Sequence, residues 1–97
     1  MRRDDFVFCI GFEGSTAIID GRLLRRYAAR STLQLAEAGL FKQAINSAIY
    51  ASNPQELEAV LALYNQKTGS PAGSVEELKR IFGVSGVPEG VKKVSVV

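Results

Sequence analysis

The feature that most constrains the fold is an apolar run close to the start of the chain, from Phe6 to Phe12. Large aromatic and aliphatic side chains alternate along it, which is the period-two pattern of a β-strand. One face carries Phe6, Phe8, Ile10 and Phe12, and the other carries Val7, Cys9 and Gly11. Because both faces are apolar, the strand needs cover on both sides, from a helix, from neighbouring strands or from another subunit.

The residues of a tight turn follow the run at once. Gly14 lies between Glu13 and Ser15, and glycine readily adopts the positive φ that such turns require. The next residues, 16–19, are β-branched or apolar, which is typical of a returning strand. We therefore predict a β-hairpin over residues 6–19.

Helix-start signals divide most of the remaining chain. In each signal a capping side chain is followed three positions later by Glu or Gln, and the pair satisfies free backbone donors. These pairs are Ser31 with Gln34, Asn53 with Glu56, and Ser74 with Glu77. Gly39 and Gly83 supply helix ends, because glycine favours the left-handed C-terminal cap. Apolar residues at helical spacing over 41–49 and 57–64 predict two helices packed as a helical hairpin.

Together these elements indicate the α+β fold class and a single domain, residues 1–97. A last strand is expected over 91–97, where two adjacent lysines are the kind of charge that protects a sheet edge. We predict a small antiparallel sheet, made of the N-terminal β-hairpin plus the C-terminal strand, packed against four or five short helices including the central helical hairpin. Residues 1–5 are expected to be frayed and residues 67–74 to form an exposed loop.

Composition removes most catalytic chemistry from consideration. The 97 residues include no His and a single Cys, Cys9, so the chain lacks the usual general base near neutral pH and a common metal ligand. The Ser/His/Asp and Cys/His arrangements of nucleophilic enzymes are therefore absent. The carboxylates do not gather on one helix face as a metal site requires. We expect no enzymatic activity, no metal, no cofactor and no small-molecule substrate.

The lone cysteine also bears on the compartment, because it cannot close a disulfide within the chain. Arg2 and Arg3 precede the apolar run as in a secretion signal, but Asp4 and Asp5 head the run and no small-residue cleavage site follows. No apolar stretch reaches the roughly 18 residues of a membrane span. We expect a bacterial-type cytoplasmic protein that does not contact membranes.

A cluster of arginines is the main candidate for a binding site. Asp20 can cap a helix from Gly21 to about Arg30, and a helical wheel places four arginines of this segment within one arc. They are Arg22, Arg25, Arg26 and Arg30. Guanidinium groups fork onto phosphate oxygens and displace counterions, which favours nucleic-acid or other polyanion binding. The alternative is a solvated face paired with Asp4, Asp5 or Glu37, because the net charge of +2 is small for a nucleic-acid-binding domain.

Gly39 lies between two predicted helices, as glycine does in the turn of a helix-turn-helix. The small residue expected four positions before this glycine is a bulky leucine. The following helix is expected to expose Gln43, Asn46 and Ser47, with Lys42 as its one cation, which is too few groups for base and phosphate contacts. We interpret Gly39 as an ordinary helix break.

Two functions are favoured, and both are recognition, because an enzyme would need a substrate-bound cofactor or residues donated by another subunit. The first is a non-catalytic protein-interaction or assembly module that self-associates, because a symmetric dimer would bury a strand that is apolar on both faces. The candidate contacts are Phe6, Phe8 and Tyr50, and the partner is a second copy or another protein. The alternative is nucleic-acid or polyanion binding through the arginine-rich face at 22–30, which should weaken steeply as salt rises.

Overall fold

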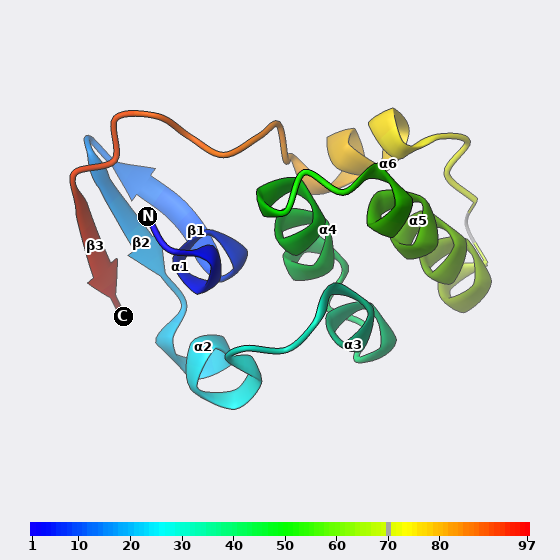
Figure 1. Ribbon diagram of the computed structural model, residues 1–97, viewed down its shortest axis with the longest axis horizontal. Helices are drawn as coiled ribbons and strands as arrows, with labels where there is room; N and C mark the ends of the chain where they lie inside the picture. Colours follow the sequence, from blue (N-terminus) through cyan, green and yellow to red (C-terminus); the bar gives the residue numbers. More distant parts are fainter. Residues whose placement is uncertain (70) are drawn as a thin grey trace.

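A three-stranded sheet stands beside a group of helices in the computed structural model of the chain, which describes residues 1–69 and 71–97 (Figure 1). The elements in chain order are α1 (Arg3–Val7), β1 (Cys9–Glu13), β2 (Thr16–Ile19), α2 (Gly21–Tyr27), α3 (Thr32–Glu37), α4 (Phe41–Tyr50), α5 (Pro54–Thr68), α6 (Val75–Phe82) and β3 (Lys93–Val96). The sheet lies at one end of the molecule, α3 to α6 lie at the other, and α1 packs against α4 where the two parts meet. The predicted α+β fold class is confirmed.

The start of the chain differs from the prediction, because the first half of the apolar run forms helix α1 and β1 begins only at Cys9. Two acids in the first turn favour the helix, since negative charge stabilises a helix N-terminus. One of them, Asp5, accepts a hydrogen bond from the Arg2 backbone N–H at 3.1 Å. The strand predicted over 6–8 is therefore wrong, and the frayed terminus is wrong from residue 3 onward. A segment that is apolar on both faces fits a buried helical turn as well as a strand.

The hairpin itself is confirmed from Cys9 onward. β1 pairs antiparallel with β2, and Cys9 lies opposite Ile19. Gly14 in the turn has a φ of 61°, in the left-handed region that glycine adopts without strain. The register shifts just after Cys9 and leaves Ile10 without a partner in β2. Ile10 is thus a bulge residue, which bends the strand and redirects its side chain.

The C-terminal strand occupies an edge of the sheet, as expected, but its direction makes the sheet mixed rather than antiparallel. The strand order is β1-β2-β3, and β3 runs parallel to β2 with Thr16 opposite Lys93 and Ile19 opposite Val96. The connection from α6, residues 83–92, reaches the hairpin-turn end of the sheet before β3 begins (Figure 1). β3 therefore starts at the same end as β2, and no local pattern in the sequence encodes that direction.

The predicted helix starts are confirmed at all three caps. The side chains of Ser31 and Gln34 form the complete reciprocal cap of α3. The Asn53 side chain accepts two backbone N–H groups at the start of α5, and Ser74 accepts one at the start of α6. The predicted helical hairpin is also present, because α4 and α5 are consecutive and pack against each other.

Helix α5 extends to Thr68, so the exposed loop predicted over 67–74 is wrong at its start. The loop is also not fully exposed, because Ala72 is buried. The Asn65 side chain accepts the Ala72 N–H at 2.7 Å and donates to the Ala72 carbonyl at 3.1 Å. These bonds hold the loop against the end of α5. Residue 70 of the predicted loop lies outside the described residues.

The hydrophobic core lies where the sheet and α1 meet α3, α4, α5 and α6. Its large, fully buried side chains come from β2, from the described helices other than α2, and from Phe8, which follows α1. They are Val7, Phe8, Ile19, Leu35, Ile45, Val60 and Leu78. An aromatic cluster extends this core toward α6, with the Phe41 ring 5.3 Å from Tyr64 and the Tyr64 ring 5.7 Å from Phe82. Both contacts are edge-to-face, the favoured geometry for aromatic pairs.

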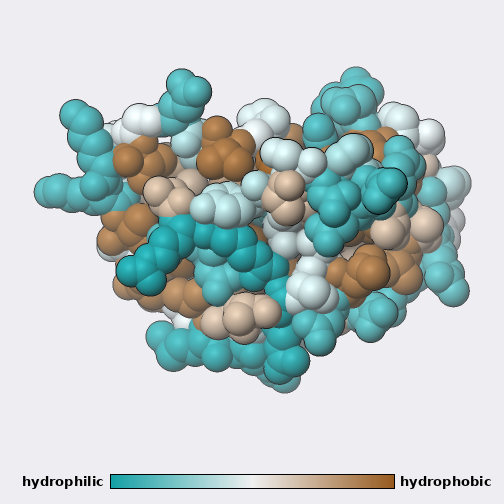
Figure 2. Space-filling view, in the orientation of Figure 1, coloured by the Kyte–Doolittle hydropathy of each residue, from teal (hydrophilic) through white to brown (hydrophobic). Residues whose placement is uncertain are grey.

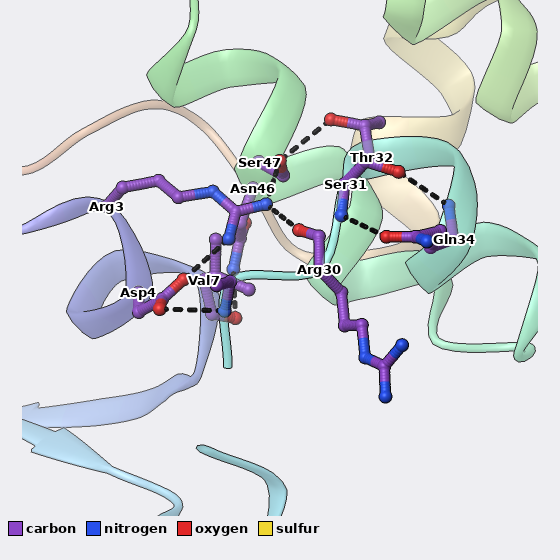
Figure 3. A network of polar contacts seen from close by, with 10 residues as sticks. Arg3, Asp4, Val7, Arg30, Ser31, Thr32, Gln34, Asn46 and Ser47 are labelled. Carbon is purple, nitrogen blue, oxygen red and sulfur yellow. Dashed lines mark hydrogen bonds and ion pairs between the residues drawn. The ribbon is translucent and has the colours of Figure 1, made fainter. Parts of the chain in front are cut away.

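A chain of polar side chains connects α1 to α5 through the core, and Figure 3 shows most of it. The Arg3 guanidinium donates to Ser47 Oγ at 2.8 Å, and the hydroxyls of Ser47 and Thr32 lie 2.7 Å apart. Thr32 in turn donates to the Glu56 carboxylate at 2.7 Å. Because Thr32 gives its single hydroxyl proton to Glu56, Ser47 must donate to Thr32. The hydrogen bonds therefore run in one direction, from guanidinium to carboxylate.

Candidate functional site

Helix α2, which carries the arginines, begins as predicted but ends at Tyr27. Asp20 accepts a first-turn backbone N–H at 3.1 Å and so caps the helix. After Tyr27 the backbone turns away, and Ala29 has a φ of 63°. The Ala29 N–H donates to the Asp4 carboxylate at 3.1 Å, which holds this turn against α1. Arg30 therefore lies outside the helix, and the prediction that it shares one helical arc with the other arginines is wrong.

The three remaining arginines, Arg22, Arg25 and Arg26, are exposed on α2. Across residues 1–69 and 71–97, none of the three forms an ion pair. The Arg26 guanidinium lies 5.5 Å from the centre of the Tyr27 ring, which is a cation–π contact. In Figure 2 the lower margin of the molecule is hydrophilic, where Figure 1 places α2. The positive charge of this face is therefore not neutralised within the described fold.

The acids that could have neutralised the arginines are placed elsewhere. Asp4 pairs with Arg3 at 2.6 Å, and Asp5 caps α1. Glu37, at the end of α3, is exposed and makes no ion pair with any described residue. The described fold therefore does not pair these acids with the arginines of α2, which was the alternative considered from the sequence. A bare cationic face remains.

Arg30 takes part in the fold through its backbone. Its carbonyl oxygen accepts a hydrogen bond from the Arg3 guanidinium, and its side chain extends away from that contact (Figure 3). A hollow of about 670 Å³ beside it is lined by Arg2 and Arg30 but also by Asp4 and Asp5. Because charges of both signs meet there, this hollow is less suited to a polyanion than the face of α2.

Two of the three predicted partner contacts lie inside the protein. Phe6 and Phe8 are 5% and 0% exposed, because α1 turns this part of the chain into the core instead of presenting it on a strand. Tyr50 is partly exposed; its ring lies 6.4 Å from the Phe6 ring, and its hydroxyl donates to the Met1 carbonyl at 3.4 Å. The fold therefore offers a partner only Tyr50 from this set.

The apolar surface of the sheet involves residues that the sequence did not single out as contacts. In β1, Ile10 and Phe12 are 53% and 52% exposed, and in β3, Val94 and Val96 are 40% and 52% exposed. The pairing places Phe12, Val94 and Val96 on the same face as the buried side chains of β2, since opposite residues share a face. Figure 2 shows hydrophobic surface gathered over the sheet. The helices thus cover this face only in part.

A groove of about 390 Å³ lies between β1 and the connection that follows α6. Residues 9–12 line one side and residues 83–88 the other. Phe6 and Asn46 also line the groove and are both buried, so they form its closed end. Lys42, one turn before Asn46 on α4, is the only charged residue in the lining.

Asn46 is buried, 3% exposed, and the expectation that it lies on an exposed face is wrong. Its Nδ2 donates to the carbonyls of Phe6 and Val7 at 3.2 and 3.4 Å, which fixes the orientation of the amide. Its Oδ1 is buried and has no hydrogen-bond partner among the described residues. A buried acceptor without a donor costs about 1–3 kcal/mol, which the packing around Asn46 must offset.

No metal site or membrane span is found in the described part of the chain. No three His, Cys, Asp or Glu side chains come together there in a group that could hold a metal ion. No helix there is both long and apolar enough to cross a bilayer. Cys9 is buried, and its Sγ donates to the Gly11 carbonyl at 3.3 Å.

Comparisons with protein-family models, with curated proteins and with solved structures find no significant match. Three surfaces of the described fold are candidates for a functional site. They are the arginines of α2, the outer edge of β3 and the groove beside β1.

Proposed function

We propose that this domain is a non-catalytic protein-interaction or assembly module that self-associates through the outer edge of β3. The proposal is carried by two half-exposed valines, Val94 and Val96, on a strand that has no neighbour on its outer side in the sheet. An edge strand presents backbone N–H and C=O groups with which another strand can pair. A second copy of β3 satisfies these groups and covers the valines at the same time.

Sheet geometry determines how the two strands would meet. Opposite residues of antiparallel strands point to the same face, so a twofold axis passes through a residue. We place it at Ser95, where Val94 of one copy lies opposite Val96 of the other. Lys93 is then opposite Val97, and the two Lys93 residues are staggered by about 14 Å along the strands. That distance exceeds the screening length of about 8 Å at physiological salt. The edge lysines therefore do not prevent this pairing.

Sedimentation velocity over a range of protein concentrations tests the proposal. We expect the native chain to form a dimer as its concentration rises, and Val94→Lys to remain a monomer, because the contact would bury an unpaired ammonium group. Ile81→Lys is the matched control, since Ile81 is 51% exposed on α6, at the opposite end of the molecule from β3 (Figure 1). A native chain that is monomeric at the highest concentration would refute self-association.

Polyanion binding by the exposed arginines is the second candidate function. It is supported by the absence of ion pairs at Arg22, Arg25 and Arg26 within the described residues. An unneutralised guanidinium can bind phosphate without first breaking an internal contact, and its counterions are released on binding. Three arginines on one short helix form a small site, so binding should not depend on nucleotide sequence.

Fluorescence polarisation with a labelled DNA duplex tests this second function. Three phosphate contacts predict binding about 40-fold weaker when salt rises from about 50 to about 200 mM. Arg25→Ala/Arg26→Ala should weaken binding to all sequences alike. Lys67→Ala/Arg80→Ala removes the same charge from α5 and α6 and should have a smaller effect. Absence of binding at low salt would exclude the polyanion function.

A further inference from the structure

We propose that the groove beside β1 binds an extended segment of a partner protein in which an apolar and an acidic side chain are two residues apart. The groove follows the edge of the sheet opposite to β3, so the proposal does not depend on self-association. One side of the groove is four consecutive residues of an edge strand. A partner segment can therefore add to the sheet as a further strand, where backbone hydrogen bonds supply affinity and side-chain pockets supply specificity.

The size of the groove matches a short stretch of extended chain. Residues in a sheet are about 3.3 Å apart along a strand, with strands about 4.8 Å and layers about 10 Å apart, so each residue fills roughly 160 Å³. The groove volume of about 390 Å³ then accommodates roughly two to three residues. The Ile10 bulge lies in this stretch, and its side chain is directed to the surface instead of the core.

Apolar side chains form most of the open part of the groove. Ile10 and Phe12 stand on the β1 side, and Val87 stands on the other side and is 43% exposed. Burying such surfaces is favourable in proportion to the area removed from water. An apolar side chain of the partner segment, lying between β1 and residues 83–88, buries all three. This is the first part of the recognition.

Lys42 determines the charge of the partner. It is the only charged residue of the lining and makes no ion pair with any described residue. Lys42 belongs to α4, on the helix-covered side of the sheet, which is also the side of Phe12. Side chains two residues apart on a strand point to the same face. The apolar and acidic side chains of the partner must therefore be two residues apart.

The edge of β1 provides the third requirement, a partner whose backbone can hydrogen-bond to it. An extended peptide carries a backbone N–H at every residue except proline. A small organic acid would satisfy Lys42 alone and leave the edge of β1 unpaired, which is why a peptide is the better match.

The proposal can be tested with two end-capped, fluorescein-labelled pentapeptides. The acidic peptide has the sequence Thr-Val-Thr-Glu-Thr, and the basic peptide replaces its Glu with Lys. We expect the acidic peptide to bind at least about 10-fold more tightly, because like charges in contact are strongly unfavourable. In the Lys42→Glu variant this preference should reverse. Lys67→Glu makes the same change of charge on α5 and should leave the preference unaltered.

Nuclear magnetic resonance locates the bound peptide. We expect shifts of the backbone amide signals of residues 9–12 and 83–87, and none at β3. The same shifts in Val94→Lys would show that the groove acts without the proposed dimer. The proposal is overturned if neither peptide causes shifts, if both bind equally, or if the shifts map to β3. It is also overturned if N-acetylvaline alone gives the same shifts at the same concentration, since the groove would then be a small-acid site.

Discussion

Thr32→Val tests the directed chain of hydrogen bonds that crosses the core. The substitution keeps the volume of the side chain and removes the hydroxyl of a residue that is only 3% exposed. That hydroxyl accepts the proton of Ser47 and donates its own to Glu56, each across 2.7 Å. Valine can do neither. The variant therefore breaks the chain at its centre without creating a cavity.

The expected loss of stability follows from the two groups, on Ser47 and Glu56, that lose their hydrogen-bond partner in Thr32→Val. Ser47 is 4% exposed, and its hydroxyl proton loses its acceptor, which costs about 1–3 kcal/mol for a buried donor. Glu56 is half-buried, so water replaces its lost bond in part and the loss is about 1 kcal/mol. The new methyl group returns about 0.8 kcal/mol of hydrophobic stabilisation. The net destabilisation is about 2 kcal/mol, or a Tm lower by about 8–16 °C.

Urea and thermal unfolding followed by circular dichroism measure this loss. Thr16→Val is the matched control, because Thr16 is half-buried and its hydroxyl bonds to no described residue; its stability should change by less than about 0.5 kcal/mol. Ser47→Ala removes the hydroxyl donor that Thr32→Val leaves without an acceptor. The destabilisation of the double variant should therefore be smaller, by about 1 kcal/mol, than the sum of the two single destabilisations. Strictly additive losses, or a Thr32→Val variant as stable as the control, would refute the directed chain.

Two backbone predictions concern the ends of α2. A Cβ added at Gly21 would lie 2.5 Å from the Val97 carbonyl oxygen, whereas one added at Gly11 would meet nothing within 4 Å. Urea unfolding should therefore show that Gly21→Ala is less stable than the native chain by about 1–3 kcal/mol. Gly11→Ala should be as stable as the native chain or more stable. Equal losses for the two would contradict the close approach at Gly21. Ala29 has a φ of 63°. The Ala29→Gly variant should be more stable to unfolding by about 0.5 kcal/mol, because relief of the left-handed strain outweighs the added freedom of the unfolded chain. A lower Tm for this variant would contradict that strain.

The parts of the fold that the sequence predicts well are those decided within a few residues. A capping side chain and the N–H that it accepts are three positions apart, as at Ser31, Asn53 and Ser74. The hairpin turn is equally local, because it needs only a glycine at the position of positive φ. Such signals do not depend on the rest of the chain, which is why these elements are found where the sequence placed them.

The errors concern contacts between distant residues. The end of α2 depends on the bond from Ala29 to Asp4, across 25 positions, and without that bond the sequence favours a helix that continues to Arg30. The direction of β3 depends on the path of residues 83–92 around the sheet. The choice between strand and helix at the start of the chain depends on α4, which covers α1. None of these partners can be recognised from a periodicity.

For the candidate sites, the sequence likewise predicts features that depend on one helix alone, but not those that depend on packing between helices. The exposure of Arg22, Arg25 and Arg26 follows from their positions on an amphipathic helix, and the structure bears it out. Asn46 and Ser47 were expected to be exposed because the apolar stripe of their helix lies on other positions. In the fold, α4 contacts α1, α3 and α5, so polar positions of this helix are buried as well. The unpartnered Oδ1 acceptor of Asn46 follows from that burial.

We predict that the two recognition functions proposed for this domain are coupled, because their surfaces meet where α2 begins. The Gly21 N–H donates to the Val97 carbonyl at 2.9 Å, so the arginine helix starts against the end of β3. In the proposed dimer, Val97 lies opposite Lys93 of the partner. Each arginine face is thereby brought close to a lysine of the other copy, and these like charges repel across the contact.

Salt should therefore act on the two functions in opposite directions. The screening length falls from about 30 Å at 0.01 M salt to about 8 Å at 0.15 M, so self-association should strengthen over this range while polyanion binding weakens. At low salt, a short DNA duplex that neutralises the arginines should promote the dimer, because linkage is reciprocal. Sedimentation velocity with and without the duplex measures this effect. If the dimer dissociation constant does not change with salt or with the duplex, the arginine face does not lie beside the interface, and the pairing centred on Ser95 is wrong.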